Sequence, residues 1–142
     1  MTWRSLLLAF SVSMLVACSS PSGKAVRIDN AWSPVAPPGV STIAVYADVS
    51  STRADTLMGV STALADSAQI HSMNEAAGMM QMRHVPRVDL QPGVILHLAP
   101  GGMHVMLMGV KQLLPVDAEI PLMFHFATAG DVAVVARVRA AS

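Results

Sequence analysis

From residue 26 onward the sequence is built of short apolar runs separated by Pro, Gly, Ser and Asp, and no long segment shows helical periodicity bounded by caps. Runs of this length and spacing are typical of short β-strands. They predict an all-β fold, an antiparallel β-sandwich. Residues 54–57 and 63–67 could form helical turns, but both are too short to change the class. The expected strands are 26–28, 41–49, 56–61, 68–73, 79–85, 94–98, 103–110, 119–126 and 132–138.

The first 18 residues read as an export leader. Arg4 supplies a positive charge, and an apolar run over 6–17 has the length of a signal-peptide core but is short for a membrane span. The run ends in Leu15-Val16-Ala17-Cys18, which resembles a bacterial lipoprotein box. We expect a lipoprotein signal peptide at 1–17, lipid on Cys18 and a flexible tether to residue 24, which would place the protein in the bacterial periplasm, anchored to a membrane. The alternative is a plain secretory signal with an incidental cysteine.

About 125 residues follow the leader, enough for one domain at 25–142. The formal net charge is +0 and no cluster of Lys and Arg stands out, which argues against binding to nucleic acid. Cys18 is the single cysteine, so no intramolecular disulfide can form.

Histidine and methionine are concentrated between residues 71 and 108, a segment that holds His71, Met82, His104 and Met106. On the expected strand at 103–110, alternation places Val105 on one face and both His104 and Met106 on the other. Imidazole and thioether donors together form a soft, uncharged set that favours Cu(I). The pattern therefore predicts a copper site, although methionine is also a common filler of irregular cores.

The same residues carry a family resemblance. The spacing of these residues matches the signature of the PCuAC family of periplasmic copper chaperones. That signature is His, ten residues, Met, twenty-one residues, His, one residue, Met, and it is met here by His71, Met82, His104 and Met106. Other segments also resemble that family, namely 31–32, 44–46, 78–82, 100–109 and 111–114. The similarity extends over roughly residues 25 to 139.

The resemblance implies a cupredoxin-like Greek-key β-sandwich that binds Cu(I) through His71, Met82, His104 and Met106. It also implies delivery of copper to the binuclear copper centre of cytochrome c oxidase, often alongside a Sco-type thiol protein. Such a protein is a carrier and not an enzyme.

Further donors lie near this signature. His84, Met73, Met80 and Met108 could assist the four signature residues, but a rim position is the simpler interpretation for His84, because four ligands already complete a tetrahedral site. Structural roles are expected for the remaining histidines, His97 and His125. The aromatic residues Trp32 and Tyr46 are expected to lie in the core.

Other functions fit the sequence less well. A blue-copper electron carrier needs a thiolate ligand, and this chain has no cysteine beyond Cys18. A zinc hydrolase needs a base near an open metal position, and Glu75 is the only acidic residue close to His71 in the sequence. The sequence has no G-x-S-x-G motif for a serine hydrolase. Two alternatives remain open: a lipid-anchored β-sandwich binding module without a metal, and a copper storage or buffer protein.

Overall fold

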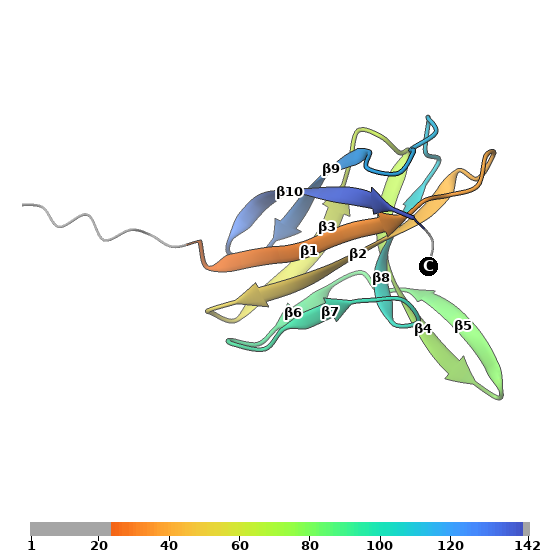
Figure 1. Cartoon of the computed structure of the whole chain (residues 1–142). Helices are drawn as coiled ribbons and strands as arrows, with labels where there is room; N and C mark the ends of the chain where they lie inside the picture. Colours follow the sequence, from red (N-terminus) through yellow and green to blue (C-terminus); the bar gives the residue numbers. More distant parts are fainter. Residues whose placement is uncertain (1–23, 141–142) are drawn as a thin grey trace, which may run out of the picture.

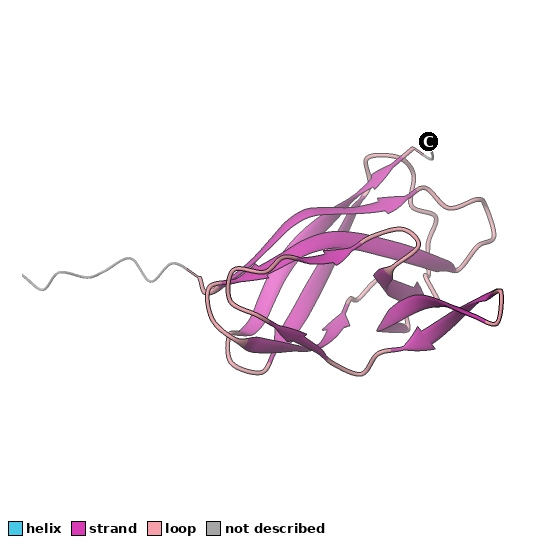
Figure 2. Cartoon of the chain, turned by 90° about the horizontal axis from the view of Figure 1, so that it is seen from below, coloured by secondary structure: helices cyan, strands magenta, loops and turns pink. Residues whose placement is uncertain are grey.

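The computed structural model describes residues 24–140, which form ten strands and no helix (Figures 1 and 2). These residues therefore contain no helix that is long and apolar enough to cross a membrane. The predicted leader, Cys18 and most of the predicted tether lie outside the described residues. The strands are β1 (Val26–Pro34), β2 (Thr42–Ser51), β3 (Asp55–Ser61), β4 (Ser67–Ala76), β5 (Met79–His84), β6 (Val88–Leu90), β7 (Leu96–Leu98), β8 (Met103–Met108), β9 (Glu119–Phe126) and β10 (Gly130–Arg139).

The strands pair in the order β5-β4-β8-β2-β1-β10-β9-β3-β6, and β7 pairs with β2. Along one edge, β2 pairs with β8 through its first half and with β7 through its second half, so the sheet divides there. Strands β8 and β9 follow each other in the chain but pair with different neighbours, as in a Greek key. The predicted all-β sandwich is confirmed.

One strand pair departs from the predicted antiparallel arrangement, because β1 and β10 are parallel, with Trp32 opposite Arg137. A parallel pair needs a long connection between its strands. Here the connection consists of all the intervening strands, so no short-range sequence signal specifies the pairing.

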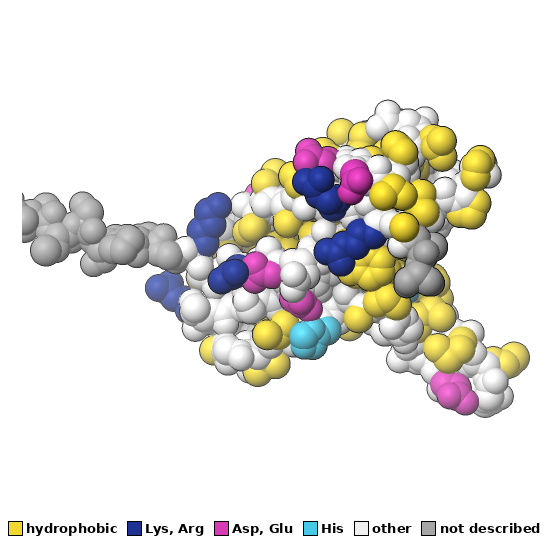
Figure 3. Space-filling view, viewed as in Figure 1, with side chains coloured by type: hydrophobic (Ala, Val, Ile, Leu, Met, Phe, Trp, Pro, Cys, Tyr) yellow, Lys and Arg dark blue, Asp and Glu magenta, His cyan; other side chains and the backbone are white. Residues whose placement is uncertain are grey.

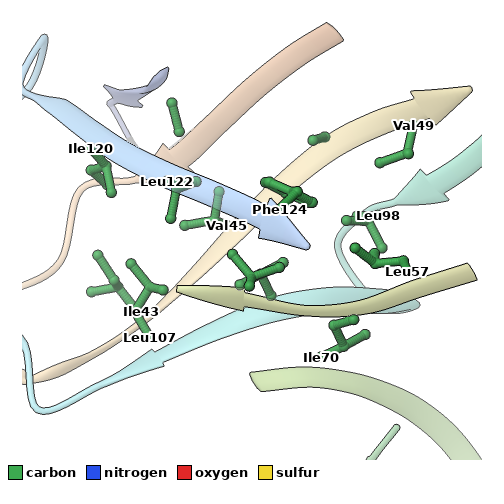
Figure 4. Packing of buried hydrophobic residues seen from close by; sticks show 14 of the residues in the cluster. Ile43, Val45, Val49, Leu57, Ile70, Leu98, Leu107, Ile120, Leu122 and Phe124 are labelled. Atoms are coloured by element: carbon green, nitrogen blue, oxygen red, sulfur yellow. The ribbon is translucent and has the colours of Figure 1, made fainter. Parts of the chain in front are cut away.

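The core lies where the two parts of the folded sheet face each other (Figure 4). Strand β2 contributes every second residue from Ile43 to Val49, and β9 contributes every second residue from Ile120 to Phe126. Val105 and Leu107 of β8 and Ile70 of β4 complete the same cluster. Because strand side chains alternate, residues next to these on β4 and β8 point away from the core.

The β4–β5 hairpin extends beyond the body of the sandwich (light green, lower right in Figure 1). Its turn consists of Ala77 and Gly78, which have φ values of 52° and 74°. Two consecutive residues with positive φ fit the two-residue turn that joins tightly paired strands, and glycine adopts this conformation without strain. The hairpin is thus a regular two-stranded ribbon in which cross-strand neighbours are fixed by register.

The predicted strand positions agree with the structure most closely at 119–126, which is β9. Neither of the expected helical turns forms: residue 54 precedes β3, which includes 55–57, and residues 63–66 form a turn before β4 begins at Ser67. The sequence pattern does not predict the short strand β6, since three residues are too few to show alternation.

Candidate metal centre

The candidate site is centred on β4, where His71 lies directly opposite His104 of β8 on one side and His84 of β5 on the other. The ring centroid of His71 is 6.1 Å from that of His104 and 6.0 Å from that of His84. Directly opposed residues share a face of the sheet. Three imidazoles from three strands therefore stand in a row on the face of the sheet that points away from the core.

The two signature methionines lie on opposite sides of this row. Met106 is opposite Gln69, two residues before His71, and Met82 is opposite Met73, two residues after His71. Each thioether is thus a diagonal neighbour of His71, a distance that long side chains can span. The pairing brings His71, His104 and Met106 together, whereas Met82 approaches from the hairpin and is separated from Met106 by β4.

Burial also differs across the four residues. His104 is only 4% exposed, and Met82 is 48% exposed. The candidate site thus has a buried side on β8 and an open side on the hairpin, so a ligand or partner would reach it from the direction of Met82.

Hydrogen bonds define which ring nitrogens are available. Nδ1 of His104 donates to the carbonyl oxygen of Gly102 at 3.0 Å, so its Nε2 carries the lone pair. Nε2 of His71 donates to Oε1 of Gln69 at 3.1 Å, which leaves the lone pair on Nδ1. That Nδ1 is buried and has no hydrogen-bond partner. A buried acceptor without a partner is unfavourable unless something else binds it, and a soft cation suits a neutral imidazole nitrogen.

Electrostatics favour neutral imidazole at the centre of the row. Burial, and then the neighbouring His104 and His84 rings, hold the pKa of His71 below its ordinary value of 6.5. Protonated imidazole cannot bind a metal. His71 therefore stays neutral, the form that a metal ion requires, to lower pH than a free histidine.

Two aromatic rings border the site. The ring of Tyr46 on β2 is 6.3 Å from that of His104, and Trp32 on β1 is 4.9 Å from Tyr46, with the guanidinium of Arg139 5.3 Å above the Trp32 ring. Burial raises the pKa of Tyr46. The prediction that Trp32 and Tyr46 are core residues is wrong: Val45 and Ala47 point into the core, so Tyr46 between them points outward beside His104.

The remaining histidines make surface contacts elsewhere. His97 Nδ1 donates to Asp48 at 2.7 Å, and Asp48 also accepts a hydrogen bond from Asn30. His125 Nδ1 donates to Asp131 at 2.7 Å. Both therefore have structural partners, as expected. Within residues 24–140, no three His, Cys, Asp or Glu side chains form a group that could hold a metal ion, so the candidate set combines imidazoles with thioethers.

The fold matches solved PCuAC domains. The copper-bound PCuAC domain from PmoF2 is 30% identical with a TM-score of 0.69, over 84% of this chain and 95% of that domain. The Cu(I) form of DR1885 from Deinococcus radiodurans is 28% identical with a TM-score of 0.63, over 79% of this chain and 76% of that protein. Both structural similarities show that the fold of this chain is that of a PCuAC-type, cupredoxin-like β-domain. They confirm the family resemblance found in the sequence.

Sequence comparison leads to the same family. The protein "Putative lipoprotein Lxx21020" of Leifsonia xyli subsp. xyli is 32% identical over 123 residues, which cover 82% of this chain and 72% of that protein. The family described as "Putative lipoprotein LpqE-like" matches residues 26–138. The chain belongs to this LpqE-like family.

Proposed function

We propose that the protein is a copper chaperone that binds one Cu(I) as cargo through His71, Met82, His104 and Met106. The observation that carries the proposal is the β4–β8 register, which sets His71 opposite His104 and places Met106 diagonally beside them. The unpartnered Nδ1 of His71 supports it, because a buried, neutral imidazole nitrogen suits a soft monovalent cation. Copper-bound relatives of the same fold give independent support.

The decisive experiment is a Cu(I) titration of the purified protein against a chromophoric chelator under reducing, anaerobic conditions. Met82→Leu keeps the apolar volume and removes the donor, so the ligand role and a packing role give opposite results. We expect one equivalent of Cu(I) for the wild type and at least a ten-fold lower affinity for Met82→Leu. Met58→Leu, an equally exposed methionine on β3, serves as the matched control. Equal affinities for wild type and Met82→Leu would contradict the assignment.

Delivery rather than storage follows from the donor chemistry. Thioethers and imidazoles bind Cu(I) without negative charge, whereas a cysteine pair binds it as thiolates. The ion should therefore pass to a reduced dithiol acceptor of the Sco type and onward to the binuclear copper centre of cytochrome c oxidase. We expect Cu(I)-loaded protein to lose its metal to an excess of reduced dithiol acceptor and to keep it when the acceptor is oxidised. Retention in the presence of reduced acceptor would instead favour a storage or buffer role.

The location of this chaperone follows from the leader. We propose that residues 1–17 are removed, that Cys18 carries lipid and that the domain acts in the bacterial periplasm on a membrane anchor. The lipoprotein relative and the LpqE-like family support an anchored envelope protein. Cys18→Ser should abolish lipid labelling and block leader removal. Mature wild-type protein with an unmodified Cys18 would exclude lipidation but leave copper binding intact.

A further inference from the structure

The outward face of the β4–β5 hairpin carries more soft donors than the proposed four-residue site uses. Beyond the His71–His84 pair, the next directly opposed pair on this face is Met73–Met82, and the following one is Glu75–Met80. Alternation places Met80, Met82 and His84 on the same face of β5 and Met79 on the other. A row of thioethers therefore leads from the proposed site toward the tip of the hairpin.

We propose that Met73, Met80 and Met82 form a second, outer Cu(I) site on the hairpin, through which the cargo leaves the protein. This inference rests on the proposed function. Directly opposed residues have Cβ atoms about 4.5–5.5 Å apart, and long side chains also reach diagonal neighbours. Met73 lies opposite Met82, and Met80 is the diagonal neighbour of Met73, so three flexible thioethers can close on one ion.

Accessibility distinguishes the outer site from the inner one. Met80 is 57% exposed and Met82 is 48% exposed, whereas His104 is 4% exposed. A dithiol acceptor must contact the ion before the last protein ligand leaves, and it can do so at the hairpin more readily than at the buried His104. The space-filling view shows apolar and acidic side chains together at the end of the hairpin (Figure 3).

Charge at the outer site also favours a cation. Glu75 lies directly opposite Met80, on the same face as Met73. Arg83 is on the opposite face of β5, where its side chain donates to Gln81. The outer site therefore has one carboxylate and no cation on its own face of the ribbon.

Met82 is common to both sites and acts as the pivot of the transfer. As the ion moves outward, its bonds to His71, His104 and Met106 break, its bond to Met82 remains, and bonds to Met73 and Met80 form. Copper stays Cu(I) throughout, and no proton is released, because thioethers are neutral donors. Since one thioether serves both sites, a second Cu(I) should bind more weakly than the first.

The test is a Cu(I) titration of the full chain, followed by chelator competition and by the NMR signals of ¹³C-methyl-labelled methionines. We expect a first tight equivalent and a second weaker one, with the Met73 and Met80 methyl signals moving in the second step. The double variant Met73→Leu/Met80→Leu should weaken the second equivalent at least ten-fold, keep the first, and slow copper loss to a dithiol acceptor. Met79→Leu, which removes an adjacent exposed methionine from the other face, should leave both equivalents unchanged.

The outcomes separate this inference from the proposed function. A tight first equivalent with no second, or a second that survives Met73→Leu/Met80→Leu, overturns the outer site and leaves the chaperone proposal standing. Absence of any tight Cu(I) binding overturns both. The single variant Met80→Leu changes an exposed side chain at the end of a regular ribbon, so its result stands even where the double variant fails to fold.

Discussion

His71 Nε2 donates a hydrogen bond to Oε1 of Gln69 at 3.1 Å, and this contact leaves the lone pair of the ring on Nδ1. Residues that orient a metal-binding imidazole typically change metal affinity by about 10–100-fold when removed. We therefore expect Gln69→Leu to lower Cu(I) affinity by about ten-fold or more in a chelator competition, with little change in stability.

Two further variants test whether the hydrogen bond itself is responsible. Gln69→Glu retains an acceptor for the Nε2 proton and should keep most of the affinity. Gln81→Leu makes the same chemical change on the other face of the hairpin and should have no effect. A loss of affinity in Gln81→Leu as large as in Gln69→Leu would argue against an orienting role.

The low pKa of His71 predicts how the site responds to acid. Burial, and then the His104 and His84 rings, lower this pKa from 6.5, so protonated His71 is disfavoured in the folded protein. The corresponding stability is present above pH 6.5 and is lost as the pH falls through the lowered pKa. Cu(I) affinity should follow the same course, since the proton and the metal compete for one nitrogen.

The measurement is Cu(I) competition between about pH 5 and pH 8, the range in which histidine changes charge. We expect the decline to begin below pH 6.5. His97→Gln removes an exposed histidine that pairs with Asp48 instead, and it should leave the profile unchanged. A decline that starts above pH 6.5 would contradict the direction of the shift.

Tyr46 is predicted to support the site through packing. Its ring contacts Trp32 at 4.9 Å and His104 at 6.3 Å, and aromatic pairs contribute about 0.5–1.5 kcal/mol each beyond buried area. Tyr46→Leu should lower the free energy of unfolding by about 1–3 kcal/mol in urea denaturation. Tyr46→Phe keeps both ring contacts and should remain near the wild type. Equal stability of Tyr46→Leu and Tyr46→Phe would show that the ring contacts contribute little.

Asp55 is predicted to stabilise the turn between β9 and β10. Its carboxylate accepts hydrogen bonds from the backbone N–H groups of Thr128 and Ala129, each at 2.9 Å. Burial acts to raise the pKa of Asp55, but the N–H donors of Thr128, Thr56 and Ala129 outweigh it and hold the pKa below 3.8. This stability is present above pH 3.8 and is lost as the pH falls through the lowered pKa.

Asp55→Ala should lower the free energy of unfolding by about 1–3 kcal/mol at neutral pH, because two N–H groups lose a charged acceptor. Asp29→Ala removes a carboxylate that pairs with Arg27 at the surface, and such pairs contribute about 0–1 kcal/mol. The difference between these variants in urea denaturation should shrink below pH 3.8. A difference that persists unchanged in acid would contradict the prediction.

Local alternation explains why much of the fold was predictable from the sequence. On β8, Val105 and Leu107 are buried, so His104 and Met106 had to share the other face. The same reasoning applies to β2, where the burial of Val45 and Ala47 places Tyr46 outside the core. This alternation is visible in the sequence, and at Tyr46 it outweighs the general tendency of aromatic residues to be buried.

Long-range pairing explains what could not be predicted. The contact between His71 and His104 depends on β4 lying beside β8, and the position of His84 depends on the register of β4 with β5. His84 is exposed, which is compatible with the expected rim position, and the register places it directly opposite His71. Alternation identifies the face of a strand but not its neighbours, so only the structure reveals the row of three imidazoles and the thioethers beyond it.

The parallel pairing of β1 with β10 is a late step in assembly. Strand β1 can pair with β2 early, but its second neighbour, β10, is the last strand to be made, and contacts between such distant segments slow folding. A chain that followed the proposed leader across a membrane from the N-terminus would stay incompletely assembled until residues near Arg139 arrive. The closed sandwich that supports the β4–β8 pairing of His71 with His104 would then be completed only after export.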